Sequence, residues 1–410
     1  MAGAYHAPMT TETLLAEAQE LQGDAVRLRR RLHEHPELGL HLPFTQERVL
    51  EALDGLGLTI STGDTTTSVV ATLDGEQPGP TILLRGDMDA LPMHEDTGLD
   101  FSSRIDDAMH ACGHDLHTTM LVNAARLLTA RRDQITGSVR FMFQPGEEGH
   151  HGAQFMLDEG LLDTAADRPI TGAFALHVFS VLPAGLIALK GGPQMASADQ
   201  FRITVKGQGG HASAPHQALD PVPIACEIVQ ALQTFVTRSL DVFDPGVITV
   251  GRIQAGSTFN VIPETAELYG TMRAVSEKTR AKLLAGMQRV AEGVCAAHDT
   301  VAEIEIEHGY PVTVNDRDFA TFAHDVAADL LGDKSVARMP NPVMGSEDFS
   351  YVLQRVPGAM AFLGAAPRGV SAGHLEPNHS NRVAFEEDVM AAGTALYAAV
   401  ALRHLTGPSA

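Results

Sequence analysis

The sequence predicts an α/β protein: a catalytic domain with a mostly parallel β-sheet and an inserted lid domain. Two observations support this class. Strand-like and helix-like segments alternate through the first half of the chain and again near its end, a pattern typical of parallel sheets. Between them the order is β-α-β-β-α-β, that of a ferredoxin-like unit of about a hundred residues. We expect a split main domain, residues 1–193 and 309–410, around an insert at residues 194–308.

The first part of the main domain is expected to supply helices, and buried strands with polar residues at their ends. Apolar spacing predicts a helix over residues 11–33 that Pro36 ends, and another over residues 45–56 capped by Thr45. The remaining elements are strands over residues 68–73, 81–84, 138–143 and 172–176, and a long helix over residues 113–131. The apolar strand at 81–84 runs directly into Asp87 and Asp89, so it delivers carboxylates at its carboxyl end, where such sheets bind ligands.

The insert and the C-terminal part complete the pattern. The insert is expected to contain strands over residues 200–206, 247–253, 264–273 and 301–307, and helices over residues 221–238 and 277–296. After it, the main domain resumes with a helix over residues 316–331, a strand over 360–363 and a helix over 386–404. Cys226 and Cys295 fall on apolar faces of the two insert helices, and we expect both in the core.

Composition limits the partners and the compartment. The 410 residues are 44% hydrophobic and 20% charged, which is ordinary for a globular enzyme. A formal charge of −22, from 29 basic and 51 acidic residues, disfavours nucleic acid. Three scattered cysteines form no disulfide framework, residues 1–13 lack the features of a secretory signal, and no apolar run approaches the roughly 20 residues of a membrane span. We expect a cytoplasmic protein with no nucleic-acid or membrane partner.

The segment Met109–His117 carries the strongest chemical signal. Its nine residues include three histidines, one cysteine and one aspartate, the ligand types that divalent transition metals prefer. Cys112 and His114 flank a glycine that permits a tight turn before a helix. A single cysteine or histidine is usually structural, but the pair at this position favours metal ligation. His110 and His117 also lie nearby, and not every histidine here can bind a metal.

Further candidates follow other strands. Glu147 and Glu148 come directly after a buried strand, which suits one metal ligand and one general base, although an acidic turn in solvent is the alternative. His177 ends an apolar strand and would otherwise be a buried structural histidine. His374 and His379 compete for a final ligand position. Asp87 and Asp89 would orient ligand imidazoles, or would simply form a turn at the strand end.

The insert offers three polar candidates. Residues 207–213 are glycine-rich but match neither a dinucleotide-binding loop nor a P-loop, so the glycines are better explained as presenting His211 on an exposed turn. Asn260 and Arg273 lie at strand ends of the same domain. None of these three signals is specific by itself.

Together these motifs resemble the dinuclear metallopeptidase family that contains aminoacylases, hippurate hydrolases and indoleacetyl-amino-acid hydrolases. The matching segments are residues 30–38, 85–92, 109–117, 144–148, 175–178, 209–215 and 260–273. Gly146 stands where alanine is frequent in the paired-glutamate motif. At the C-terminal end, Pro377–Arg382 departs from the commoner Leu-His-x-Pro pattern. His379 is preferred over His374 because it stands at the usual distance before residues 383–387.

The resemblance implies a role for each candidate residue. Cys112 would bridge two divalent metal ions, whose sites are completed by His114, Glu148, His177 and His379. Zinc or manganese would suit such ligands, with cobalt or nickel also compatible. Glu147 would be the general base, His211 would stabilise the oxyanion in the neighbouring subunit of a homodimer, and Asn260 and Arg273 would hold the substrate.

The activity that the resemblance implies is hydrolysis of N-acyl amino acids to a carboxylic acid and a free amino acid. A dipeptidase or carboxypeptidase on the same scaffold is the nearest alternative, because only the acyl pocket would differ. A noncatalytic metal-binding scaffold is a second alternative, and the intact Glu147 argues against it. A zinc nucleobase deaminase is disfavoured because the sequence lacks an H-x-E motif with a downstream P-C-x-x-C.

Overall fold

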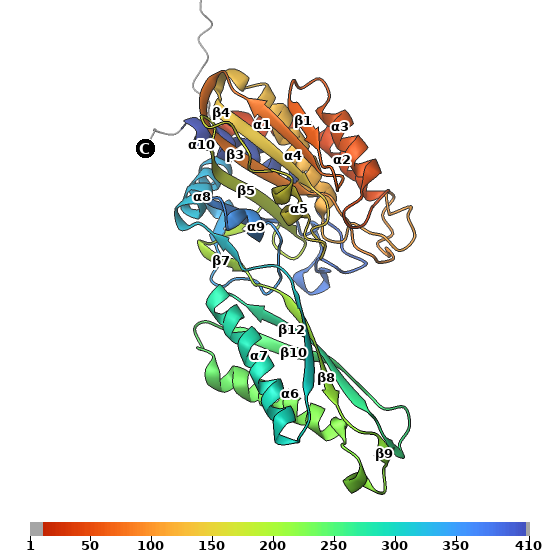
Figure 1. The fold of residues 1–410 in the computed structure, drawn as a ribbon. Coiled ribbons are helices and arrows are strands. Elements are labelled where there is room, and N and C mark those ends of the chain that lie inside the picture. Colours follow the sequence, from red (N-terminus) through yellow and green to blue (C-terminus); the bar gives the residue numbers. More distant parts are fainter. Residues whose placement is uncertain (1–10, 407–410) are drawn as a thin grey trace, which may run out of the picture. The chain divides into compact units, whose positions relative to one another are not determined.

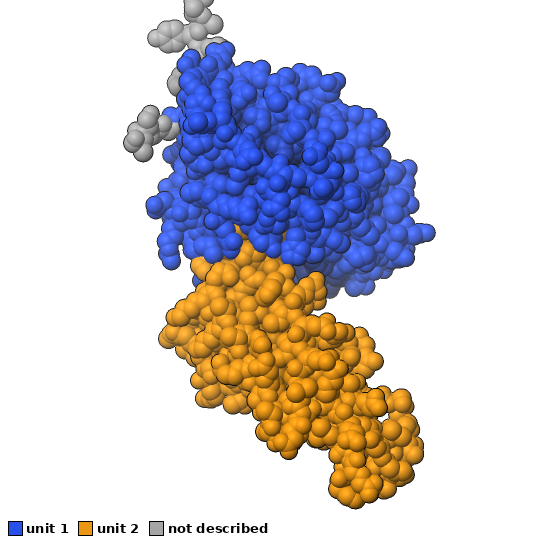
Figure 2. Space-filling model, viewed as in Figure 1, with its two compact units in different colours: residues 1–192, 314–340, 351–410 blue, residues 193–313, 341–350 orange. Residues whose placement is uncertain are grey.

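The computed structural model describes residues 11–406 and divides them into two compact units (Figure 2). Unit 1 comprises residues 11–192, 314–340 and 351–406, and unit 2 comprises residues 193–313 and 341–350. Unit 2 therefore takes in a ten-residue segment, 341–350, that the sequence pattern did not separate from the C-terminal part of the chain. The domain boundaries drawn from the sequence stay a prediction.

An eight-stranded sheet forms the centre of unit 1 (Figure 1). Its order is β1-β2-β4-β3-β5-β16-β6-β15, and the four central strands β4, β3, β5 and β16 are mutually parallel. The strands are β1 (Thr59–Thr62), β2 (Val69–Asp74), β3 (Gln77–Asp87), β4 (Thr136–Gln144), β5 (Ile170–Phe179), β6 (Ile187–Leu189), β15 (Val336–Arg338) and β16 (Gly358–Gly364). Antiparallel pairs occur toward the edges. Because β3, β4 and β5 are parallel neighbours, their carboxyl ends meet at one edge.

Several helices of unit 1 contact the strands of this sheet directly, and others pack on those helices. They are α1 (Thr11–Glu20), α2 (Gln22–His33), α3 (Pro43–Leu53), α4 (His114–Thr129), α5 (Gly152–Asp158), α8 (Arg317–Leu331), α9 (Ser350–Leu353) and α10 (Val389–Thr406). All residues of α4 except Arg126 and Thr129 are buried, since α4 packs against α2, α10 and β3. Length and hydropathy alone would let α10 cross a membrane, but 78% of its residues are buried inside the protein, so core packing accounts for its apolar character.

The helices at the N-terminus differ from the prediction in two places. The helix expected over residues 11–33 is interrupted at Leu21, two residues before Gly23, a residue of low helix propensity. The helix expected from Thr45 begins instead at Pro43, which is favoured in the first helical turn. Its cap is not Thr45: the Glu37 carboxylate accepts the N–H groups of Phe44 and Thr45 at 3.1 and 2.8 Å. That cap lies seven residues away, outside the local pattern.

Unit 2 contains the predicted ferredoxin-like arrangement. Its elements are β8 (Asp199–Lys206), α6 (Pro221–Ser239), β10 (Gly246–Ala255), β12 (Thr265–Ala274), α7 (Glu277–Ala297) and β13 (Ala302–His308). The sheet order is β10-β12-β8-β13 with every pair antiparallel. The short strands β9 (Gly210–His211) and β11 (Val261–Ile262) pair separately. The chain passes between the units at β7 (Gly192–Met195), at β14 (Thr313–Asn315), and again before and after residues 341–350. The expected α/β class with a ferredoxin-like insert is confirmed.

One core prediction in unit 2 is wrong. Cys295 is buried as expected, but Cys226 is exposed. On α6 the buried face contains Ile224, Ala225 and Ile228, and Cys226 is rotated away from it by the helical period. The apolar composition of this helix extends beyond the face that it buries.

Candidate metal centre

The carboxyl edge of the parallel strands brings the predicted ligands of unit 1 together. β3 ends at Asp87, β4 ends at Gln144 just before Glu147 and Glu148, and His177 lies within β5, two residues before its end. Cys112 is buried on the turn that enters α4. Residues from four segments of the chain therefore lie close together, because neighbouring parallel strands end at the same edge of the sheet.

Gly113 makes the turn before α4 possible. Its φ is +85°, a left-handed conformation that disfavours a side chain. A Cβ at this position would lie 2.4 Å from Cγ2 of Val178 on β5. Glycine therefore lets the turn approach the sheet closely, and this approach fixes Cys112 and His114 on either side of it.

Cys112 is shared by two groups of ligand-type atoms. Its Sγ lies 3.4 Å from Nε2 of His177 and 3.3 Å from Nε2 of His379. The first group is Cys112, His114 and His177, and the second is Cys112, Glu148 and His379. His379 Nε2 lies 3.3 Å from Glu148 Oε1, and His114 Nε2 lies 3.9 Å from it. Ligand atoms around a tetrahedral metal stand about 3.3–3.8 Å apart, so these spacings fit two ions that share a thiolate.

The burial of His114 supports the same conclusion. Its Nδ1 donates to the backbone carbonyl of Asp89 at 2.8 Å, which leaves Nε2 as the atom facing the cluster. Nε2 is buried, and no hydrogen-bond partner in residues 11–406 satisfies it. A buried polar atom without a partner costs free energy, and coordination to a metal would remove that cost.

The electrostatics of the cluster favour positive charge at its centre. The Cys112 and Glu148 groups raise the pKa of His379 to about 10. For His114, burial opposes protonation, but the carboxylate of Asp87 and the thiol of Cys112 raise its pKa well above the usual value. Burial, and then the nearby His117, lower the pKa of His177 well below its usual value, which keeps that imidazole neutral and able to donate a lone pair. Burial and then Glu148 raise the pKa of the Cys112 thiol, so a cation is needed to make it a thiolate.

The neighbouring carboxylates hold different parts of the cluster. Asp87 Oδ1 accepts from His117 Nδ1 at 2.5 Å, and His117 Nε2 accepts from the Val178 N–H at 2.8 Å. Both ring nitrogens of His117 are therefore occupied, which leaves it a structural role. The Asp89 carboxylate accepts the N–H groups of Glu147 and Glu148, each at 2.9 Å. It thus orients the paired-glutamate turn, while its backbone carbonyl orients the imidazole of His114.

The C-terminal loop brings His379 to the cluster and leaves His374 outside. His374 belongs to no ligand group among the described residues, and its Nδ1 lies 2.7 Å from the hydroxyl of Ser371. His379 has a φ of +70°, and its N–H donates to the Ala111 carbonyl at 2.9 Å. The preceding Asn378 donates to the carbonyls of Val178 and Cys112 at 2.9 and 3.3 Å. Asn378 was not among the site residues predicted from the sequence, although it stands next to His379 in the same motif.

A second network missed by sequence reasoning supports the start of α4. Asp115, which follows His114, is fully buried, and its Oδ2 lies 2.7 Å from Arg29 Nε and 2.8 Å from His33 Nδ1 on α2. The only sequence evidence for a role of the end of α2 was the resemblance of residues 30–38 to a family signature. His110 is also buried, and burial lowers its pKa to about 3, but it belongs to no ligand group within the described chain. His117 does lie in a third group of ligand-type atoms with Asp87 and His114, but both of its ring nitrogens are already hydrogen-bonded.

In unit 2 the structure brings His211 and Asn260 together but not Arg273. His211 pairs with Val261 across β9 and β11, and the Ala212 N–H donates to the Asn260 carbonyl at 3.1 Å. His211 and Asn260 line an open hollow of about 450 Å³, and His211 is exposed. Arg273 lies near the opposite end of the ten-residue strand β12, where its Nη1 donates to Ser346 Oγ at 3.1 Å. Burial lowers the pKa of Arg273.

Known proteins are similar to this chain in sequence and in fold over most of its length. A thermostable carboxypeptidase 1 from Saccharolobus solfataricus is 37% identical, over 96% of this chain and 98% of the relative. An N-acetylcysteine deacetylase from Bacillus subtilis is 38% identical, over 83% of this chain and 87% of the relative. The crystal structure of the Bacillus subtilis YXEP protein, a dinuclear metal binding peptidase, matches with a TM-score of 0.82 and 33% identity, and covers 94% of this chain and 99% of that chain.

These findings confirm the resemblance, the enzyme class and the cofactors expected from the sequence. The protein is a metal-dependent amidohydrolase that acts on small-molecule substrates with two divalent metal ions. The model of peptidase family M20/M25/M40 matches residues 83–403, which include every predicted ligand. With that match and relatives above 30% identity along almost its full length, the chain belongs to peptidase family M20/M25/M40.

Proposed function

We propose that this amidohydrolase cleaves N-acyl amino acids, releasing a carboxylic acid and a free amino acid. The observation that carries the proposal is the Cys112-centred pair of ligand groups with Glu147 beside it: Glu147 Oε2 lies 3.9 Å from His114 Nε2. A relative named for deacetylation of N-acetylcysteine supports the substrate class. A relative named as a carboxypeptidase supports the second candidate, cleavage of a peptide at its C-terminal residue.

The residues of unit 1 would divide the work between ligation and proton transfer. Cys112 would bridge the metals, with His114 and His177 on one side and Glu148 and His379 on the other. Two divalent ions held there, zinc or manganese, would lower the pKa of water and polarise the scissile carbonyl. Glu147, which is buried and anchored through its N–H to Asp89, would take a proton from the attacking water and return it to the leaving nitrogen.

The residues of unit 2 would act on the substrate. His211 would stabilise the developing oxyanion, and the exposure of its turn suits action on a second copy of the chain. Asn260 lines the same hollow and would hold the substrate. Arg273 would bind a carboxylate through its planar guanidinium. This division of labour requires a homodimer, which we place in the cytoplasm.

The test compares Glu147→Gln with Glu148→Gln in metal-reconstituted protein. We expect Glu147→Gln to lose turnover of N-acetyl amino acids while its metal content, measured by atomic emission, stays at the wild-type value. Glu148→Gln should lose metal. Loss of metal in Glu147→Gln with retention in Glu148→Gln would reverse the two roles, and substantial activity of Glu147→Gln would exclude it as the base.

The substrate class needs its own assay. Wild-type protein loaded with Zn²⁺, Mn²⁺, Co²⁺ or Ni²⁺ is presented with N-acetyl amino acids and with dipeptides of the same C-terminal residues. The proposal expects higher kcat/KM for the N-acetyl compounds. The reverse order would favour the carboxypeptidase alternative, and turnover of neither would contradict both.

A further inference from the structure

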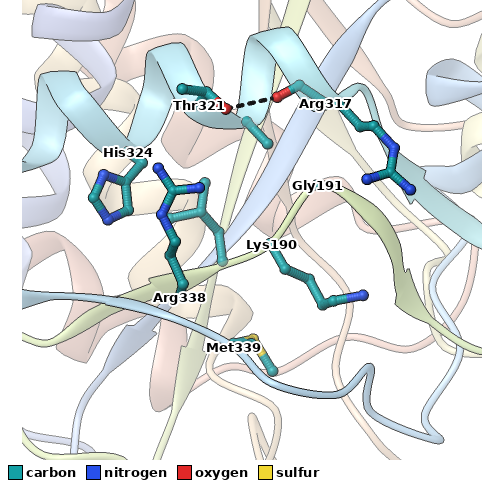
Figure 3. Close-up of a pocket in the computed structure, with 9 residues that line it drawn as sticks. Lys190, Gly191, Arg317, Thr321, His324, Arg338 and Met339 are labelled. Atoms are coloured by element: carbon teal, nitrogen blue, oxygen red, sulfur yellow. Dashed lines mark hydrogen bonds between the residues drawn. The ribbon is translucent and has the colours of Figure 1, made fainter.

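A cavity in unit 1 collects basic side chains and shares no residue with the metal cluster (Figure 3). Its volume is about 250 Å³. The lining residues are Leu189, Lys190, Gly191, Arg317, Ala320, Thr321, His324, Arg338 and Met339. The family chemistry described above uses none of them.

Three neighbouring elements build this cavity. β6 and β15 are parallel and pair Leu189 with Arg338, so Lys190 and Met339 leave the same edge of the sheet. On α8, Arg317, Thr321 and His324 are spaced by four and three residues and share one face of the helix. Figure 3 shows that face above the ends of the two strands. The site thus lies at the carboxyl ends of this parallel pair, which is the sheet edge opposite the metal cluster because β6 runs antiparallel to β16.

Positive charge dominates the cavity wall. Lys190, Arg317 and Arg338 line it together with the imidazole of His324, and none of the lining residues is acidic, although the chain as a whole carries a charge of −22. Neither guanidinium forms an ion pair with any residue between 11 and 406. Burial and then the positive charge of Arg317 lower the pKa of Lys190. Arg317 and Lys190 therefore repel each other, and an anion beside them would relieve that repulsion.

Two acidic groups of α8 and its amino end, Asp325 and Asp316, are already engaged. The Asp325 carboxylate lies 3.3 Å from Nδ1 of His324 on the same helix. The Asp316 side chain accepts the N–H groups of Asp318 and Phe319 at 3.1 and 2.8 Å. The amino end of α8 is thus capped by the protein's own carboxylate, and a bound anion would be held by side chains of the cavity.

We propose that this cavity binds a phosphate-type dianion, either inorganic phosphate or a small phosphate monoester, through Arg317, Arg338 and Lys190. The planar guanidinium fork matches two phosphate oxygens, and the lysine ammonium acts as a point charge. A dianion neutralises more of the clustered charge than a single carboxylate does. At about 30 Å³ per water molecule, the cavity has room for roughly eight waters, enough for a phosphate with a small substituent. The apolar atoms of Leu189, Ala320 and Met339 would face that substituent.

The test is calorimetric titration of the metal-loaded protein with inorganic phosphate at low ionic strength. Arg317→Gln and Arg338→Gln should each weaken binding by about 10- to 100-fold, the effect of losing one charged hydrogen bond. The matched control is Arg355→Gln, which removes an exposed arginine of unit 1 that lies outside the cavity and has no ion pair in the described chain. It should bind as the wild type does. Arg338 is exposed on the edge strand β15, so Arg338→Gln carries the test if Arg317→Gln does not fold.

Phosphate could also bind the metal ions, so the titration is repeated after metal removal with a chelator. Binding at the cavity should persist in the stripped protein and remain sensitive to Arg338→Gln. Equal dissociation constants in the wild type and both cavity variants would overturn the proposal, and so would the loss of all phosphate binding with the metals. A dicarboxylate that binds more tightly than phosphate, with the same dependence on Arg338, would overturn the choice of phosphate. Because binding is measured without turnover, none of these outcomes depends on the proposed catalytic function.

Discussion

Replacing Gly113 with alanine should damage the metal centre through a steric effect that can be isolated. The new Cβ would stand 2.4 Å from Cγ2 of Val178, and the residue would have to keep a φ of +85°. The left-handed conformation costs about 1–2 kcal/mol for a residue with a side chain. Crowding of a packed interior adds about 1–3 kcal/mol. The expected loss in the free energy of unfolding is therefore about 2–5 kcal/mol.

A second glycine separates the two contributions. Gly185 has a φ of +81°, and a Cβ there would meet no atom within 4 Å. Gly185→Ala should therefore show the conformational cost alone, about 1–2 kcal/mol. Urea denaturation of both metal-free variants measures the free energies. Because the collision would push apart Cys112 and His114, Gly113→Ala should also bind metal about 10- to 100-fold more weakly, in the range seen when support around a ligand is lost. Equal destabilisation in the two variants, with wild-type metal affinity in Gly113→Ala, would refute the close-approach argument.

Three further predictions concern acid stability, oxidation and the dimer. Burial alone would raise the pKa of Glu95, but its contact with His33 lowers that pKa to about 2. The ionised Glu95 therefore stabilises the protein above about pH 4.5, and this stabilisation is lost as the pH falls toward 2. Glu95→Gln should make the free energy of unfolding depend less on pH at the acid end, and an unchanged dependence would contradict this. Cys112 should react slowly with peroxide in the metal-free protein, because burial raises its pKa and keeps it a thiol; metal-free protein that is treated with peroxide, freed of it and reloaded with metal should therefore recover its activity, and a loss of activity together with oxidation of Cys112 detected by mass spectrometry would contradict this. His211→Ala and Glu147→Ala homodimers should both be nearly inactive. A purified heterodimer of the two variants should recover up to about half of wild-type activity, because one of its two centres then has both Glu147 and the partner's His211. A verified heterodimer without activity would show that His211 does not act on the neighbouring subunit.

Local sequence patterns were sufficient for most of the fold. The period of apolar residues predicted helices close to α4, α6, α7 and α8, and continuous apolar runs predicted strands close to β3 and β4. The ferredoxin-like insert followed from the order of its elements. Those patterns fail where the deciding contact is distant in sequence: the cap of α3 comes from Glu37, and Cys226 belongs to the exposed side of a helix whose composition is apolar on both sides.

The sequence by itself determined which residues can carry metal chemistry, because Cys112, His114 and the paired glutamates stand at turns that follow buried strands or precede a buried helix. Only the tertiary structure decided which of them meet. It brings His379 to within 3.3 Å of Cys112 across 267 positions of sequence and leaves His374 outside. It also assigns the Asp89 carboxylate to the backbone of Glu147 and Glu148, and it gathers Lys190, Arg317 and Arg338 around one cavity. The physical reason is that the type and spacing of residues along the chain indicate only the local backbone conformation. The distances between metal ligands and the clustering of charged side chains depend instead on which strands become neighbours in the sheet.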